Sequence, residues 1–339
     1  MPCMVIVGGF FGDEGKGKIV SYLALKDQVD LAVRTGSVNA GHTVKWNGKK
    51  YKLRIVPSAF VHEKCKLLIG AGANINVSIF LKEVEETKCK GRIGVDFQSS
   101  IIEEKHIAED RGNEYLAKKI GTTGQGVGPA IAERVRRKAK LARDVPELKQ
   151  YLTDVALEVN KALDRGEKVI LEGTQGTFLS LYHGTYPYVT GRDTTASAVC
   201  SEVGVGPTKV DEVLIVFKAY VSRVGEGPLP GELSPEEADR RGWTEIATVT
   251  GRRRRVAPFN FELARRAVML NGATQIAITK LDILFPSCAK ARNFDNLSEE
   301  AKKFISKIED ELGVPVTLIG TGEGVYDVID LRGRKLEKT

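Results

Sequence analysis

The sequence predicts an α/β protein with a large, mostly parallel central sheet that is flanked by helices and carries loop excursions. Short apolar runs, rich in β-branched residues and bounded by turn residues, recur along the chain. Such nearly continuous runs are typical of parallel strands covered on both faces. Helical patterns fall between them, and this alternation indicates the α/β class. No fixed-period repeat or low-complexity linker divides the 339 residues, so we expect a single domain over residues 1–339.

The elements follow in order along the chain. Strands are predicted at residues 4–7, 31–33, 67–69, 168–171, 213–217, 275–279 and 316–319. Helices are predicted at residues 18–26, 77–88, 148–165, 261–270 and 298–311. Asn271 and Gly272 form a stop signal for the fourth helix, and Ser298 is placed to cap the fifth.

Composition narrows the class of protein only modestly. The formal net charge of +7 fits an anionic ligand or a nucleic acid, but an excess of this size also serves solubility. Five cysteines without C-x-x-C spacing argue against a zinc or redox motif and favour reduced thiols in a cytoplasmic protein. No apolar run approaches the about 18 residues of a transmembrane helix, and the start MPCMVIVGG has no basic segment of a signal peptide.

The loop GDEGKGK follows the first predicted strand and leads into the first predicted helix. Gly12, Gly17 and Lys18 match the spacing G-x-x-x-x-G-K, and a glycine-rich turn at a helix start aims N–H groups at an anion. Ile19, however, stands where a P-loop has a Ser or Thr for magnesium. Asp13 is the nearest hard oxygen ligand, and it can hold a metal or act as a base on a weakly acidic N–H. A tight turn without a ligand is the alternative.

Three further stretches have the residue types of a nucleotide site. NAGHTV contains His42, a candidate donor to a developing negative oxygen or a structural loop histidine. IGTTGQGVGP can present N–H and hydroxyl groups to a phosphate, although ligand-free glycine-rich loops are common. LEGTQGT and HGTYPYVTGRDTTAS place Gln175 to read an amide-like edge of a base, and Thr190, Thr194 and Thr195 to hold a phosphate.

Two stretches near the C-terminal end bear on the choice of nucleotide. QIAITKLDIL resembles the N/T-K-x-D guanine motif, in which the Asp accepts hydrogen bonds from N1–H and the 2-amino group of guanine. Adenine lacks this donor pair, so Asp282 favours GTP over ATP, and LIGTGEG is placed to close over the same base. TVTGRRRRV suits carboxylate or phosphate ligands but also a nucleic acid, and the stretch alone leaves both open.

Taken together, these motifs resemble the adenylosuccinate synthetase family. GDEGKGK, NAGHT, IGTTGQGVGP, EGTQGT, HGTYPYVT, TGRRRR and TKLD stand in that family's order, from Val5 to about Gly322. The resemblance implies a P-loop-NTPase-like α/β fold, magnesium and a homodimer. It also implies GTP-dependent ligation of IMP and L-aspartate to adenylosuccinate through 6-phosphoryl-IMP, the first committed step of AMP synthesis from IMP.

The resemblance also implies residue roles. Asp13 takes the N1 proton of IMP and binds magnesium beside the carbonyl of Gly41, while His42 stabilises charge on O6. The GTP set is Gly12, Glu14, Gly15, Lys16, Gly17, Lys18, Gly41, His42, Thr43, Arg255, Lys280, Leu281, Asp282, Gly320, Thr321 and Gly322. The IMP set is Asp13, Lys16, Asn39, Ala40, Thr123, Gln175, Thr190, Arg253 and Arg137, the last reaching across the dimer. The aspartate set is Thr250, Gly251, Arg253 and Arg255.

The chain departs from the family pattern at several positions. Phe10 and Phe11 replace the usual Gln-Trp, Val249 replaces a threonine, and Gly320 replaces a serine. The chain is also short between Gly128 and Leu171 and after Asp282, where the dimer contact and the loops over GTP and aspartate are expected. We interpret Phe10-Phe11 as packing that fixes the entry of the loop.

Two other readings compete with the synthetase. A P-loop switch ATPase needs a Ser or Thr after Lys18, where Ile19 stands. A nucleic-acid-binding protein that uses RRRR predicts steep salt dependence, but it gives Asp13 and TKLD no role. We expect neither a nucleic-acid nor a membrane partner.

Overall fold

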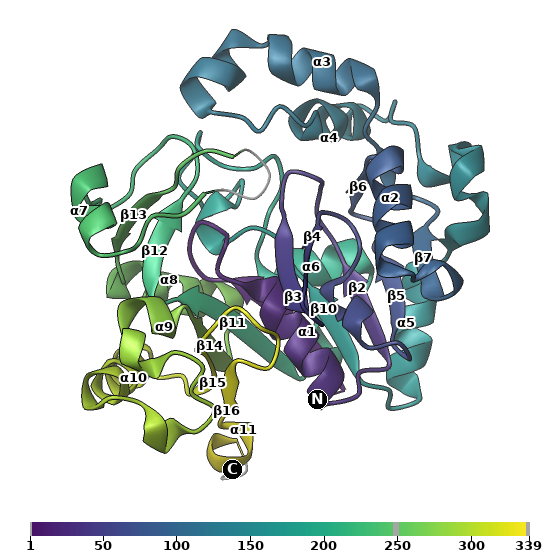
Figure 1. The fold of residues 1–339 in the computed structure, drawn as a ribbon. Helices are drawn as coiled ribbons and strands as arrows, with labels where there is room; N and C mark the ends of the chain where they lie inside the picture. The colour runs from purple at the N-terminus through teal and green to yellow at the C-terminus, as the bar shows by residue number, and fades with distance from the viewer. Residues whose placement is uncertain (1, 247–250, 337–339) are drawn as a thin grey trace.

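The computed structural model describes residues 2–246 and 251–336. Within these residues, one ten-stranded sheet runs through the centre of the molecule (Figure 1). Every pairing in this sheet is parallel except the antiparallel pairing of β15 with β16 at one edge. In spatial order the strands are β16 (Val328–Asp330), β15 (Val316–Gly320), β14 (Gln275–Thr279), β11 (Glu212–Lys218), β1 (Cys3–Gly8), β10 (Val169–Glu172), β2 (Leu31–Arg34), β5 (Lys66–Ile69), β7 (Ile93–Asp96) and β9 (Leu152–Thr153).

Three two-stranded sheets stand beside the large one. They are the antiparallel pairs β3 (His42–Trp46) with β4 (Lys49–Leu53) and β12 (Tyr220–Arg223) with β13 (Arg255–Pro258), and the parallel pair β6 (Asn74–Ile75) with β8 (Ser100–Ile101). The α-helices are α1 (Lys16–Lys26), α2 (Val77–Thr87), α3 (Glu104–Gly112), α4 (Val127–Val135), α5 (Val155–Asp164), α6 (Ala196–Val203), α7 (Pro235–Arg240), α8 (Phe261–Asn271), α9 (Leu281–Leu284), α10 (Glu299–Leu312) and α11 (Arg332–Lys335).

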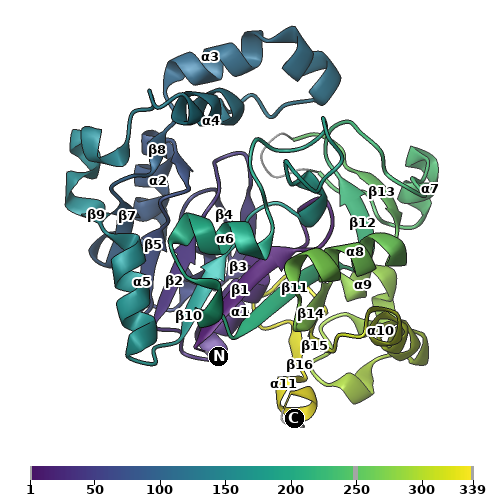
Figure 2. The same ribbon diagram turned by 180° about the vertical axis from the view of Figure 1, so that it is seen from behind.

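Helices cover both faces of the sheet, as the apolar runs require. Met4 and Ile6 of β1 pack into the cluster that contains α1, whereas Val5 and Val7 pack into the cluster under α5, α6 and α8. Figure 2 shows α5, α6 and α8 on the face opposite α1. The strand pleat thus places successive residues of one short apolar run in two separate cores.

The motif-bearing loops leave one edge of the sheet. In parallel strands the carboxyl ends share an edge, which is where ligands bind in open α/β sheets. Gly8 ends β1 before the GDEGKGK loop, Glu172 ends β10 before GTQGT, Thr279 ends β14 before KLD, and Gly320 ends β15. The sheet topology therefore brings together loops that are up to about 300 residues apart in sequence.

The fold class and all seven predicted strands are confirmed, and no strand boundary differs from its prediction by more than one residue. The helix predicted at 148–165 is wrong in its first part. Residues Pro146–Tyr151 form a 3₁₀ segment, and the α-helix begins only at Val155, where the Asp154 carboxylate accepts the N–H of Leu157 as a side-chain cap. Leu148 and Tyr151 are both buried, and their spacing of three residues in the sequence resembles one turn of an apolar helix face.

Several elements of the structure were not predicted from the sequence. The strands β7, β9 and β16 and the hairpin β3–β4 are short or half exposed, and α3 shows no apolar stripe. Helices α3 and α4 form an arm that stands above the carboxyl edge of the sheet (Figure 1). In the part of the chain that the structure describes, no helix is both long and apolar enough to cross a bilayer.

Candidate active site

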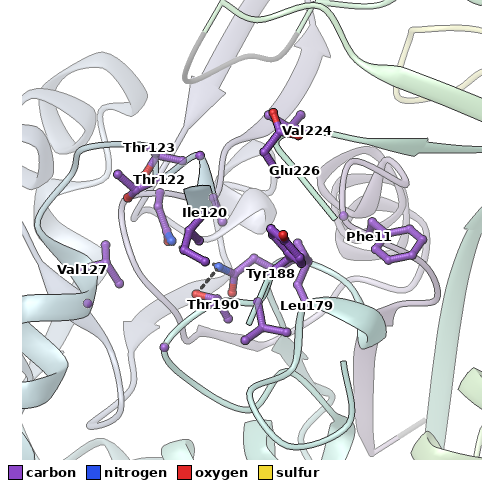
Figure 3. A pocket seen from close by; sticks show the side chains of 18 of the residues that line it. Phe11, Ile120, Thr122, Thr123, Val127, Leu179, Tyr188, Thr190, Val224 and Glu226 are labelled. Atoms are coloured by element: carbon purple, nitrogen blue, oxygen red, sulfur yellow. Dashed lines mark hydrogen bonds between the residues drawn. The ribbon is translucent and has the colours of Figure 1, made fainter. Parts of the chain in front are cut away.

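A cavity of about 380 Å³ lies between the carboxyl edge of the sheet and the arm of α3 and α4. Figure 3 shows Thr122, Thr123 and Val127 from the arm on one side, with Phe11 and Val224 on the other. Ten residues predicted for the site line this cavity: Gly12, Asp13, Lys16, Asn39, Ala40, Gly41, His42, Thr123, Gln175 and Thr190.

Glu14 braces the GDEGKGK loop from inside. Its buried carboxylate accepts the N–H groups of Phe10 at 3.0 Å and Gly12 at 2.8 Å, and it pairs with the Lys16 ammonium at 2.9 Å. Lys16 also donates to the carbonyl of Gln175. Glu14 therefore shapes the loop and does not occupy the position of a phosphate.

The first turn of α1 is left open to an anion. The residue before the helix, Gly15, adopts φ 88° and provides no side-chain cap, and no acidic residue lies in the first turn. Uncapped N–H groups at a helix start attract negative charge. This is the arrangement that a nucleotide phosphate needs.

Asp13 faces an arginine across the cavity mouth. Its Oδ2 pairs with Nη2 of Arg254 at 2.9 Å, and Asp13 has a left-handed φ of 62°. Gln175 and Lys280 share this unusual backbone region, at φ 64° and 60°. Gln28, Asn47, Lys88, Arg137 and Lys290 also have positive φ, so this conformation by itself does not identify the site, but it fixes the side-chain directions of Asp13, Gln175 and Lys280.

His42 is oriented by a fully buried carboxylate. Its Nδ1 lies 2.5 Å from Oε1 of Glu172. The Glu172 carboxylate also accepts two hydrogen bonds from Ser58, from the N–H to Oε2 at 2.7 Å and from Oγ to Oε1 at 2.6 Å. Burial, and then the nearby Arg34 guanidinium, lower the pKa of His42 to about 4. The neutral ring thus donates from Nδ1, and its buried Nε2 has no partner among the described residues.

A polar wall lies beside His42. Nε2 of Gln175 donates to Oγ1 of Thr190 at 2.9 Å, the dashed line in Figure 3, and it lies 3.5 Å from Oδ1 of Asn39. All three residues were predicted to hold IMP. Amides and hydroxyls held in this way can contact both a purine edge and a phosphate.

The guanine-motif residues lie outside the cavity, at the ends of β14 and β15. Oδ1 of Asp282 is buried with no partner in the described chain, and burial raises the pKa of this carboxyl group. The Lys18 ammonium donates to the carbonyls of Gly322 at 2.7 Å and Asp327 at 2.6 Å. Lys18 therefore links α1 to the loop after β15, instead of extending freely toward a phosphate as its motif position suggested.

The chain matches known proteins along most of its length. The family model for adenylosuccinate synthetase matches residues 5–147 and 139–287. An adenylosuccinate synthetase from Methanocaldococcus jannaschii is 56% identical over 98% of this chain and 97% of that protein. One from Methanosphaera stadtmanae is 52% identical over 99% and 100%.

The chain belongs to the adenylosuccinate synthetase family.

Solved structures agree with this assignment. The fully ligated adenylosuccinate synthetase of Plasmodium falciparum is similar with a TM-score of 0.90 at 26% identity, over 97% of this chain and all of that one. A succinoaminodeoxyadenylate synthetase of cyanophage S-2L, bound to dGMP and to dATP as energy donor, has a TM-score of 0.81 at 25% identity, over 97% and 95%. Adenylosuccinate synthetases are GTP-dependent ligases that join IMP and aspartate for AMP synthesis.

The four consecutive arginines of TGRRRR point to different partners. Arg253 donates to Asp239 at 2.8 Å and does not line the cavity. Nε of Arg255 donates to Oε1 of Glu232 at 2.7 Å, and its Nη1 donates to the carbonyls of Gly225 and Gly227, beside the cavity-lining residues Val224 and Glu226. Arg254 contacts Asp13, and Arg252 donates to the carbonyl of Gly121 in the cavity wall at 2.9 Å. Side chains alternate along extended backbone, so the inward pair is 252 and 254.

Other predicted residues are not among those that line the cavity. Arg137 is exposed just beyond α4, in a left-handed turn at φ 63°. Thr250, predicted to bind aspartate, lies outside the described residues, as does Val249; Gly251 is exposed. Thr43 follows His42 in β3, Leu281 and Thr321 are buried, and Gly17 lies in α1 against His42.

The sequence analysis missed Arg223, a buried arginine that lines the cavity. Its guanidinium lies 4.4 Å from the ring centre of Phe11 and donates to the carbonyls of Tyr188 and Pro228 at 2.8 Å. Burial lowers the pKa of Arg223 to about 10. The sequence signal that could have identified Arg223 is the glycine-rich turn VGEGPLPG that follows it, a few residues after the strand predicted at 213–217. Phe10, by contrast, is buried and packs on the rings of Phe217 and Phe259, whereas Phe11 is part of the cavity wall.

A second group of possible metal ligands lies on the arm. Ligand atoms of Glu103, His106 and Glu133 lie within 4.8 Å of one another. Both ring nitrogens of His106 are engaged, Nδ1 by the N–H of Glu103 and Nε2 by Glu133, and Lys105 pairs with both carboxylates. The group is neutralised by its own partners, and none of these residues lines the cavity.

Burial of neutral His42 predicts an acid-sensitive fold. The unfolded chain binds a proton near the ordinary pKa of 6.5, whereas the folded chain binds it only near 4. Between these values the unfolded state holds more protons, so stability is retained above pH 6.5 and lost as pH falls to 4, by up to about 3 kcal/mol.

Urea unfolding of wild type and His42→Asn at pH 7 and pH 4.5 would measure this effect. The asparagine variant should lose less stability on acidification, while exposed His183→Asn should behave as wild type. An equal acid loss in wild type and His42→Asn would contradict the assignment.

Proposed function

We propose that the cavity binds IMP and that the loops after β14 and β15 bind the guanine of GTP, with Asp13 and His42 between them. The observation that carries the proposal is the buried, unpartnered Oδ1 of Asp282. A buried polar atom without a partner costs free energy unless a ligand supplies one. The N1–H and 2-amino groups of guanine are donors of the required kind.

The residues support a two-step reaction. Asp13 accepts the N1 proton of IMP, O6 attacks the γ-phosphorus, and GDP leaves. The amine of aspartate then attacks C6 and inorganic phosphate leaves, giving adenylosuccinate. His42 serves O6 through Nε2. Because the neutral ring donates from Nδ1 to Glu172, His42 must gain a proton at Nε2 before it can donate to O6 as negative charge develops there. Asn39, Thr123, Gln175 and Thr190 hold IMP, with Lys16 and Ala40.

GTP is held by the loop and by the ends of the strands. The uncapped N–H groups at the start of α1 bind the phosphates, with Gly12, Glu14, Gly15, Gly41 and Thr43 beside them, while Lys280, Leu281, Gly320, Thr321 and Gly322 surround the base. Lys18 acts by fixing the Gly322 carbonyl. Aspartate contacts Thr250 and Gly251, and Arg252 and Arg254 take the roles first assigned to Arg253 and Arg255.

The residues also suit a magnesium ion. The carboxylate of Asp13 and the carbonyl of Gly41 both line the cavity, and hard oxygen donors completed by water and phosphates are what Mg²⁺ prefers. When bound, the ion would neutralise charge on the transferred phosphoryl group.

Asp13→Asn should abolish synthesis while the protein stays folded. Loss of the base should lower kcat by about 10²–10⁴-fold, measured as adenylosuccinate absorbance with IMP, aspartate and GTP. Asp164→Asn, at a surface ion pair, is the matched control. Unchanged turnover in Asp13→Asn would reject the base assignment, and an inactive wild type would reject the function.

Asp282 predicts a strong preference for GTP over ATP. A site built to accept two hydrogen bonds should reject the base that lacks both donors by roughly 10⁴-fold in kcat/KM. Asp282→Asn should lose most of this preference. The cyanophage relative uses dATP as energy donor, so the comparison is informative: equal use of ATP and GTP by the wild type would refute the guanine role of Asp282.

We further propose a homodimer in which Arg137 of each chain reaches the IMP of the other. Its exposure on the arm, next to Val135 at 72% exposure, supports this role. Arg137→Ala and Asp13→Asn should each be nearly inactive, yet an equal mixture, unfolded and refolded together, should recover about a quarter of wild-type activity because mixed dimers contain one complete site. No recovery would contradict a shared site.

A further inference from the structure

Four polar side chains from three separate parts of the fold contact Glu245. It lies between α7 and the undescribed residues 247–250 and is 14% exposed. Its Oε2 accepts from Lys218 at 2.7 Å and Arg254 at 2.6 Å. Its Oε1 accepts from the Tyr220 hydroxyl at 2.5 Å and lies 3.9 Å from the Lys280 ammonium.

These contacts join the two ends of the active site. Arg254 bonds Asp13 with Nη2 and Glu245 with Nη1, so one guanidinium bridges the two carboxylates. Lys280, on the other side of Glu245, immediately precedes the Leu281-Asp282 pair of the guanine motif. The carboxylate of Glu245 therefore contacts both Arg254, which pairs with the proposed general base Asp13, and Lys280, which lies next to the guanine motif.

Glu245 also closes the loop predicted to bind aspartate. The N–H of Arg254 donates to the Glu245 carbonyl at 2.9 Å, and Ile246 bridges Arg253 in an antiparallel arrangement. The ends of the loop and the guanidinium of Arg254 are thus held by the same residue.

The charge balance explains why a carboxylate is needed. Although burial favours its neutral form, the ammonium of Lys218 and the guanidinium of Arg254 hold the pKa of Glu245 well below its ordinary value. When Asp13 turns to IMP or a metal, Arg254 loses one of its two anionic partners. A buried cation left unpaired is strongly unfavourable, and Glu245 prevents that state.

We propose that Glu245 is a positioning residue for the ligation: it retains Arg254 when Asp13 is released to the substrate, and it aligns Lys280 beside the guanine site. This inference rests on the proposed roles of Asp13 and Asp282. It predicts a pattern of kinetic defects that a purely structural role would not produce, because a loss of folded protein lowers kcat without raising KM.

Glu245→Gln keeps the shape and removes the charge. We expect kcat to fall about ten-fold or more and KM for GTP and aspartate to rise several-fold, in the range seen for residues that orient reacting groups. IMP binding, titrated without GTP, should stay within about two-fold, because the IMP wall does not contact Glu245. Glu245→Asp, which restores the charge, should recover much of the loss.

Two comparisons keep the test decisive. Glu311→Gln removes a surface ion pair between α10 and Arg265 of α8, away from the cavity, and should leave all constants unchanged. If Glu245→Gln does not fold, Tyr220→Phe removes one hydrogen bond to Glu245, while its ring keeps its stacking on Trp243; it should lower kcat/KM for GTP about three-fold.

Wild-type constants in Glu245→Gln, or equal losses in the Gln and Asp variants, would overturn the inference, as would wild-type kinetics in Tyr220→Phe. An inactive wild type would instead reject the proposed function, so the two failures are distinguishable.

Discussion

The site depends on how the loop after β1 is held. A loop that offers N–H groups to a phosphate cannot use all of them on its own structure, yet it must be rigid. Glu14 resolves this conflict by accepting the N–H groups of Phe10 and Gly12 at the start of the turn, which leaves the N–H groups at the start of α1 uncapped. Its pairing with Lys16 then fixes a cation at the cavity wall.

Close packing around this loop leaves little freedom for change. A Cβ added at Gly176 would lie 2.4 Å from the Gly12 nitrogen and 2.5 Å from the Phe10 carbonyl oxygen, distances that backbone atoms cannot relieve. The segment after β10 is therefore pressed directly onto the loop after β1. Gln175 and Asp13 flank that contact, and Lys16 ties the two segments further by its bond to the Gln175 carbonyl.

Much of this arrangement could be predicted because it is local in sequence. Apolar runs indicated the strands, and glycine-rich turns at their ends indicated the loops. The direction of individual side chains could not be predicted in the same way. Four consecutive arginines present the same chemistry, and only the extended backbone shows that Arg254, not Arg253 or Arg255, meets Asp13. The motif position of Lys18 suggested a phosphate, but carbonyls from a loop about 300 residues away engage it. Glu245 matched no motif, because its partners Lys218, Tyr220, Arg254 and Lys280 lie in three separate segments of the chain.

The left-handed backbone at Asp13, Gln175 and Lys280 has a consequence for the evolution of the protein. Each such residue costs on the order of 1–3 kcal/mol, a large share of the marginal stability of a folded chain. Glycine would relieve the strain but remove the carboxylate, amide or ammonium for which we propose a role in the site. Selection for a more heat-resistant chain must therefore act elsewhere, on the cores and surface, while these three positions remain a permanent weak point of the fold.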